Sequence, residues 1–354
     1  MPFEPAISQI YRPQKEFPVH SLKYWRAVQF LLWLIGFLIF GCLVFFPSLG
    51  VLLFWNILIP VAPALLVIST GLWRNICPLA TTNLLPRRFN LSKQLKMPVA
   101  LHAKFNLVAV ILLFIIVPLR HAVFNTSGAA TAALLFGCAL VGFGMSFFYD
   151  WKSGWCSSLC PVHPVEKLYG SNSIFTMPNA HCSECVNCSI PCPDSTPNMQ
   201  PNLSKKTNYH NISGALIIGG LPGFIWGWFH VPDHSSANSL TGLRDIYELP
   251  VGGLAVTLVL YLLLKMIVNA GFQKKLVSLF AAAAVSCYYW FRIPALFGFG
   301  EFGTDGLLVN LSSSISQTVI TVTCILLSLF FFWWIVFRKP SQLSWVSRPP
   351  FKTA

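Results

Sequence analysis

Long apolar runs alternate with polar connections along the whole chain. Eight runs approach or exceed the length of about twenty residues that a helix needs to span a bilayer, and they carry few charges. They cover about 27–46, 51–72, 104–119, 128–148, 211–230, 249–268, 276–297 and 315–337. The pattern therefore predicts an all-α polytopic membrane protein with about eight transmembrane helices.

One polar connection is much longer than the others and divides the runs into two groups of four. It covers 150–209 and follows a first transmembrane half at 27–149. The second half covers 210–337, and polar tails at 1–26 and 338–354 flank the apolar region. The two halves show no similarity strong enough to claim an inverted repeat. We therefore expect one membrane unit with a large polar loop in its middle.

Composition supports the membrane interpretation. Mean hydropathy is +0.64, charged residues make up only 10% and aromatic residues 14% of the chain. A net charge of +13 would suggest a nucleic-acid partner for a soluble protein, but here the basic residues lie between apolar runs. The positive-inside rule accounts for them there. We expect the lipid bilayer as a partner and no nucleic acid.

The same rule orients the chain. A cytoplasmic N-terminus places 21 of the 24 Lys and Arg residues on the inner side, and leaves only Arg120, Arg244 and Arg292 outside. The opposite orientation would reverse this bias. We expect a multi-pass protein of the bacterial inner membrane, with both tails and the loop at 150–209 in the cytoplasm.

The long loop contains a cysteine motif with the spacing CxxCxxCxxxCP. Its members are Cys182, Cys185, Cys188 and Cys192, and Pro193 follows the last. This spacing is typical of ferredoxin-type iron-sulfur ligation, whereas a structural zinc site usually combines two separate CxxC pairs. The motif predicts a [4Fe-4S] cluster. A reducing cytoplasm, in which exposed thiols escape oxidation, agrees with the orientation from charge.

Three further cysteines lie in polar connections expected on the same side. Cys156 and Cys160 form a CxxxCP spacing at the end of the fourth run, and Cys77 precedes Pro78 after the second. The remaining cysteines fall inside apolar runs and read as small buried hydrophobic residues. They are Cys42, Cys138, Cys287 and Cys324.

Together these motifs resemble the membrane-bound polyferredoxin family typified by the NosR, NapH and CcoG proteins. Members carry CxxxCP motifs at cytoplasmic helix ends, followed by ferredoxin-type cysteine motifs. The resemblance covers roughly residues 70 to 195. Cys156 and Cys160 match one full CxxxCP, but Trp73 stands where the leading cysteine of the copy at Cys77 would be. The chain also has one ferredoxin motif where the family usually has two.

Seven loop thiols are one short of the eight that two four-cysteine clusters require. In the two-cluster arrangement, the first three motif cysteines share a cluster with Cys160. Cys192 then joins a second centre with Cys156 and Cys77, which has His163 as fourth ligand or holds three irons. Alternatively, the four motif cysteines hold one cluster by themselves, and the other three thiols are structural or redox-active.

The function that these motifs favour is electron transfer. We expect an integral-membrane iron-sulfur protein that relays single electrons between a cytoplasmic carrier and the quinone pool or a partner oxidoreductase. Polar loops contain no GxGxxG or Walker sequence, which favours a relay over a complete dehydrogenase. One alternative is a membrane metal reductase or cofactor-maturation factor, with Cys77 or Cys156 handling the metal. Another is a transporter with a structural or sensing cluster.

Basic residues around the cysteines suggest an acidic carrier such as a ferredoxin or flavodoxin, although the positive-inside bias alone would also place them there. They are Arg87, Arg88, Lys152, Lys167, Lys205 and Lys206.

Haem and quinone stay open as further cofactors. His121, His230 and His234 map to outer helix ends, where we favour solvated interfacial side chains over haem ligands. The outer loop between Phe297 and Asp305 has the composition of either a quinone headgroup site or an interfacial loop.

Overall fold

A computed structural model describes residues 19–95, 97–149, 152–170, 173–175, 180, 207–233, 240–303 and 305–338. Within these ranges the secondary structure is helical, apart from one isolated bridge between Leu95 and Tyr149. Eight of these helices are long and apolar enough to cross a membrane. The expected all-α fold with eight candidate spans is confirmed, and the chain has the build of a multi-pass membrane protein.

The first half contains four spans, and two of them change helix type on the way. They are α2 (Val19–Phe45); α3 (Pro47–Val51) with η1 (Leu52–Leu58) and α4 (Ile59–Ile68); α8 (Val99–Leu119) with η2 (Arg120–Phe124); and α9 (Gly128–Phe148). The second half contains α11 (Asn208–Ala215) with η7 (Leu216–Gly220) and α12 (Leu221–Phe229); α13 (Leu240–Ile267); α14 (Gln273–Leu296); and α15 (Gln317–Phe332) with η9 (Trp333–Phe337).

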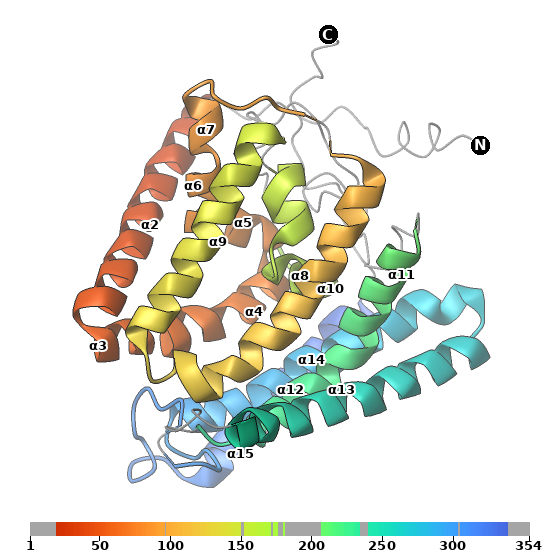
Figure 1. The fold of residues 1–354 in the computed structure, drawn as a ribbon. Helices are drawn as coiled ribbons and strands as arrows, with labels where there is room; N and C mark the ends of the chain where they lie inside the picture. Colours follow the sequence, from red (N-terminus) through yellow and green to blue (C-terminus); the bar gives the residue numbers. More distant parts are fainter. Residues whose placement is uncertain are drawn as a thin grey trace.

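Short helices fill the connections between the spans at the end of the bundle where α4 ends and α8 begins. They are α5 (Thr70–Ile76), α6 (Pro78–Asn83), α7 (Leu85–Arg88), η3 (Lys152–Leu159), α10 (Val162–Tyr169) and η8 (Ala270–Phe272). Figure 1 shows α6 and α7 beside α9, and the two halves as adjoining groups of helices. The polar connection between the two halves therefore forms helices of its own, η3 and α10, at this end of the bundle.

Several helix boundaries differ from those that hydropathy predicts, and two of them show the physical reason. The second span ends at Ile68, because Ser69 adopts an extended conformation and its hydroxyl caps α5 by accepting from Leu72 N at 3.4 Å. Helix α13 begins at Leu240, well before the apolar run, and carries an exposed Arg244–Glu248 pair in its first turns. Hydropathy marks the lipid-compatible part of a helix, whereas hydrogen bonding decides where the helix ends.

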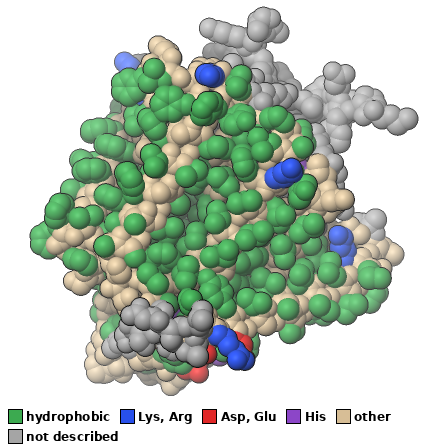
Figure 2. Space-filling model, viewed as in Figure 1, with side chains coloured by type: hydrophobic (Ala, Val, Ile, Leu, Met, Phe, Trp, Pro, Cys, Tyr) green, Lys and Arg blue, Asp and Glu red, His purple; other side chains and the backbone are tan. Residues whose placement is uncertain are grey.

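The exterior of the bundle is apolar over a broad face. Figure 2 shows hydrophobic side chains covering this face, with the few basic side chains near its rim. Phe37, Val256 and Leu326 are 60%, 70% and 61% exposed. Soluble proteins rarely expose contiguous apolar areas of this kind, and a bilayer is the environment that such a face fits.

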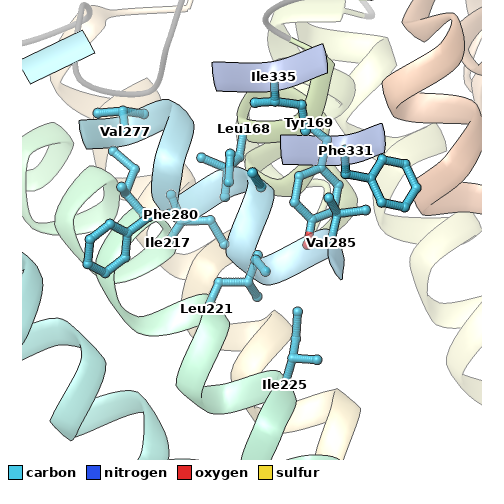
Figure 3. Packing of buried hydrophobic residues seen from close by; sticks show 14 of the residues in the cluster. Leu168, Tyr169, Ile217, Leu221, Ile225, Val277, Phe280, Val285, Phe331 and Ile335 are labelled. Atoms are coloured by element: carbon cyan, nitrogen blue, oxygen red, sulfur yellow. The ribbon is translucent and has the colours of Figure 1, made fainter. Parts of the chain in front are cut away.

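The core lies where the two halves meet, and α10 enters it. Leu168 and Tyr169 are 1% and 2% exposed and pack against buried residues of η7, α14 and η9. Figure 3 shows both side chains among Ile217, Val285 and Ile335. The short helix that follows Cys160 is therefore fixed by apolar packing to the second half of the bundle.

Helices α12 and α13 approach each other through glycine. A Cβ atom on Gly223 would lie 1.9 Å from the carbonyl oxygen of Gly253, and one on Gly253 would lie 2.2 Å from that of Gly223. These are backbone atoms, so a side chain at either position forces the helices apart. Small residues at close crossings are a common solution in membrane bundles.

We expect Gly223→Ala to destabilise the protein by about 1–3 kcal/mol, because the added methyl group overpacks a backbone contact. Gly252→Ala is the matched control, since its Cβ meets nothing within 4 Å. Thermal unfolding in detergent should show a lower Tm for Gly223→Ala and an equal or higher Tm for Gly252→Ala. Equal Tm values for the wild-type protein and Gly223→Ala would contradict the close crossing.

Candidate functional site

The cysteine motif itself lies outside the described residues, so Cys182, Cys185, Cys188 and Cys192 stay predictions from sequence. The three other loop cysteines are described. Cys77, Cys156 and Cys160 are half-buried.

The two Cys-Pro sites have the same local design. Cys77 separates α5 from α6, and Cys160 separates η3 from α10. Pro78 is the first residue of α6 and Pro161 is the residue just before α10, and at both positions the missing N–H of proline costs nothing. The backbone N–H groups two and three residues after each cysteine act to lower its pKa, those of Leu79 and Ala80 for Cys77 and those of Val162 and His163 for Cys160. Such donors favour the thiolate form of a ligating sulfur.

The structure brings these sites together, although 82 residues separate Cys77 from Cys160 in the sequence. Cys77 and Cys156 pack against the same buried pair, Ala80 and Leu84. Cys77 is also close enough to Cys160 to influence its ionisation. Cys77 therefore lies near both of the other two loop cysteines, and we refer to the region of Cys77, Cys156 and Cys160 as the thiol cluster.

Burial governs the acidity of these thiols. It raises the pKa of Cys160 to about 12, with a further contribution from Cys77, and it also raises the pKa of Cys77. Thiols of this kind are protonated at neutral pH and react slowly as nucleophiles. A bound metal cation would reverse this preference, because ligating thiols lose their protons.

A hydrogen bond ties the start of the motif segment to the same place. Ala180 N donates to Asn75 Oδ1 at 2.8 Å, and both groups are buried. Asn75 lies two residues before Cys77, and Ala180 lies two residues before Cys182 in the sequence. The chain therefore enters the cysteine motif from an anchor beside the thiol cluster.

A buried polar network holds the two Cys-Pro segments together. Arg74 Nε of α5 donates to Glu166 Oε1 of α10, and both side chains are less than 10% exposed. His163 Nδ1 lies 3.5 Å from Glu166 Oε2. Burial opposes ionisation of Glu166, but the charge of Arg74 and the hydrogen bonds of both partners prevail and lower the pKa of this carboxyl to about 2.

This network also determines the protonation state and the tautomer of His163. The side chain is 1% exposed, and burial lowers its pKa to about 4, so the imidazole is neutral. A carboxylate at Nδ1 selects the tautomer with the proton on that nitrogen, which leaves the lone pair on Nε2. Nε2 is buried and has no hydrogen-bond partner among the described residues. His163 has the arrangement of a metal-ligating histidine with its supporting carboxylate.

Within the described ranges, no three His, Cys, Asp or Glu side chains lie close enough together to hold a metal ion. A centre that uses the thiol cluster therefore also draws on ligands outside these ranges, and the cysteine motif is the natural source.

The basic residues predicted to contact an acidic carrier differ in their exposure. Arg87 and Arg88 line an open groove of about 670 Å³ together with Arg26, at the same end of the bundle as the thiol cluster. Lys167 is only 7% exposed, so the expectation that it faces a carrier is wrong: α10 is inserted into the bundle. The side chain of Lys152, and both Lys205 and Lys206, lie outside the described part.

Among the outer histidines, His121 is not available as a haem ligand. His121 is 5% exposed, with Nδ1 2.6 Å from Asp233 Oδ1 and Nε2 2.9 Å from the carbonyl oxygen of Trp228. Both ring nitrogens are engaged, which leaves none for iron. The expectation of a solvated side chain is wrong for His121, because Asp233 and the end of α12 cover it. His230 is half-buried, and His234 falls outside the described ranges.

The chain matches no protein-family model, and no curated protein or solved structure shows significant similarity to it. Its candidate site is therefore argued from its own residues.

Sequence reasoning missed the polar partners of the thiol cluster. Arg74 was counted only as a basic residue of the inner side, and neither Asn75 nor Glu166 was singled out. A signal was present, because all three lie within six residues of a Cys-Pro cysteine. Nothing in the sequence, however, showed that these two cysteines meet in space.

We expect Glu166→Gln to cost about 3–5 kcal/mol of stability, because it leaves the buried Arg74 charge without its counter-ion. Glu248→Gln is the control, since it breaks an Arg–Glu pair whose side chains are 78% and 60% exposed. That loss should amount to at most about 0.5 kcal/mol. Unfolding in detergent at pH 7 measures both, and similar small losses would show that the buried pair does not join the segments.

The Arg74–Glu166 pair predicts that the stability of the protein depends on pH. The folded pKa of Glu166, about 2, lies below its ordinary value of 4.5, so the stabilisation is complete above about pH 4.5 and is lost as the pH falls toward 2. The stability gap between the wild-type protein and Glu166→Gln should therefore narrow on acidification. Unfolding measured from pH 7 down to the lowest pH at which the protein stays in solution tests this. A gap that stays constant with pH would contradict the assignment.

Proposed function

We propose that this chain is an integral-membrane iron-sulfur protein that passes single electrons between a carrier and a membrane partner. One observation carries the proposal. The cysteines at 77, 156 and 160 converge on the point at which the chain enters the CxxCxxCxxxCP motif, through the bond from Ala180 to Asn75. Three thiols beside the start of a segment that carries a four-cysteine motif in its sequence fit what iron-sulfur ligation requires.

The residues present fit an iron-sulfur group by their chemistry. Cys182, Cys185 and Cys188 with Cys160 would hold one [4Fe-4S] cluster. Cys192 with Cys77, Cys156 and His163 would complete a second centre, and the orphaned Nε2 of His163 supports a ligand role for it. A single cluster on the four motif cysteines is the simpler assignment. When bound, a cluster supplies a one-electron redox couple.

The protein's own contribution is to place and tune that couple. The N–H groups that face Cys77 and Cys160 stabilise negative charge on sulfur, and hydrogen bonds of this kind raise a cluster's reduction potential. The Arg74–Glu166 pair fixes the two cysteine segments relative to each other. Rigid ligand segments lower the reorganisation that accompanies electron transfer, which suits a relay.

The proposal also includes the side of the membrane on which the thiol cluster lies and the electron carriers that contact it. Charge bias places the thiol cluster at the cytoplasmic face of a bacterial inner membrane. The groove with Arg26, Arg87 and Arg88 is a suitable contact for an acidic ferredoxin or flavodoxin. Membership of the polyferredoxin family rests on the matched CxxxCP and ferredoxin spacings. The shared design of the two Cys-Pro sites supports it.

Anaerobic purification in detergent, iron and sulfide analysis, and EPR of the dithionite-reduced protein test the proposal. About eight irons with spin-coupled signals indicate two centres, about seven indicate a three-iron second centre, and about four indicate a cluster on the motif cysteines alone. Zinc in place of iron would overturn the electron-transfer function.

Substitution of the cysteines of the thiol cluster distinguishes two roles for them. They are either ligands of an iron-sulfur cluster or thiols that handle a metal ion directly. If Cys77 and Cys156 are cluster ligands, Cys77→Ser and Cys156→Ser should each lower the iron content and change the EPR spectrum. Cys138→Ser, which alters a cysteine within α9, is the matched control and should leave both unchanged. Full iron content in the first two variants would instead support the metal reductase or maturation factor.

A further inference from the structure

Two arginines are buried at the end of the bundle opposite the thiol cluster. Arg120 of η2 is 3% exposed and Arg292 of α14 is 2% exposed. They share an acceptor: Arg120 Nη2 and Arg292 Nη2 donate to Asn56 Oδ1 at 3.1 and 2.9 Å. Two positive charges therefore lie close together around one neutral amide oxygen.

The other partners of these arginines are also neutral. Arg120 Nε donates to Asn125 Oδ1 at 2.6 Å, and Arg292 Nη2 donates to the carbonyl oxygen of Trp55 at 3.0 Å. Within the described ranges neither guanidinium forms an ion pair with a carboxylate, and the buried Nε of Arg292 has no acceptor. Buried charges are normally paired, so these two guanidiniums lack a counter-ion in direct contact.

The nearest carboxylate is engaged elsewhere. Asp233 accepts from Asn125 Nδ2 at 2.8 and 2.7 Å, and its Oδ1 is also hydrogen-bonded to His121 Nδ1 at 2.6 Å. Its backbone N–H in turn donates to Asp305 Oδ2 at 2.8 Å. These contacts hold the two carboxylates on the wall of the site without direct contact to either guanidinium.

A cavity of about 50 Å³ lies between these groups, and its charged lining consists of Arg120 and Arg292 with the carboxylates Asp233, Glu301 and Asp305. It has room for a few water molecules or one small solute, and it is far smaller than the pockets of about 300–1,000 Å³ that hold drug-sized ligands. The outer loop lies directly against it. A Cβ on Gly306, which has φ +72°, would be 2.3 Å from Arg292 Nη1.

We propose that this cavity binds a small monovalent oxyanion, either a carboxylate such as acetate or an inorganic ion such as nitrate. The planar donor fork of arginine matches two oxygen acceptors, and the anion supplies the counter-ion that the two guanidiniums lack in direct contact. Asp233 and Asp305 on the facing wall set the selectivity: they repel a second negative charge, so sulfate binds more weakly. A quinone ring does not fit the cavity.

Thermal unfolding of the full chain in detergent tests the site, with sodium acetate, nitrate and sulfate each replacing chloride at constant ionic strength. Acetate or nitrate should raise the Tm of the wild-type protein with a saturable dependence on concentration, and sulfate should do so less. Comparison of acetate with nitrate shows whether the site prefers a carboxylate or an inorganic oxyanion.

Arg292→Gln should abolish the saturable response. Arg292→Lys retains the charge and loses the fork, so its half-saturating concentration should rise roughly tenfold or more. Arg244→Gln is the control, because Arg244 is an exposed arginine of the same outer side, and its response should equal that of the wild-type protein.

Two results would overturn the proposal. An equal rise in Tm for the wild-type protein and both Arg292 variants would reveal a general salt effect. No rise in the Tm of the wild-type protein with either acetate or nitrate would show that the cavity does not bind a monovalent oxyanion.

Discussion

The buried ion pair between Arg74 and Glu166 is the contact on which the inner end of the protein depends. It joins α5 to α10, and each of these helices adjoins one Cys-Pro cysteine. A buried pair of this kind contributes little net stability over an apolar pair, but the loss of one partner is costly. Its main effect is therefore on geometry: Cys77 and Cys160 keep a fixed relation only while both charges are present.

Helix α10 connects this site to the membrane-spanning bundle. Glu166 and His163 face the polar network, while Leu168 and Tyr169 pack in the core against the second half of the chain. The four consecutive buried residues from Glu166 to Tyr169 therefore connect the polar network with the apolar core through one short helix. Movement of the second half would be transmitted to the Cys160 segment, because a close-packed core is not continuously deformable.

The polar groups of the protein gather at two opposite ends, with apolar packing between them. The inner end combines thiols, a neutral histidine and a satisfied ion pair, which suits a metal centre. The outer end combines two unpaired guanidiniums with carboxylates that are bound to other donors. The two proposals differ in the charge of the group that each end would bind: a metal cation at the inner end and an anion at the outer end.

Apolar runs of membrane length by themselves determined the eight helical spans, and cysteine spacing by itself indicated iron-sulfur chemistry, since both signals are local in the chain. Tertiary structure decided everything that depends on contact between distant segments. It brought Cys77 to Cys156 and Cys160, paired Arg74 with Glu166, and buried Lys167 and His121, which sequence alone had placed in solvent. Charge counting treated Arg120 and Arg292 as ordinary outer residues for the same reason: burial and pairing are properties of the packed bundle, and no short stretch of sequence encodes them.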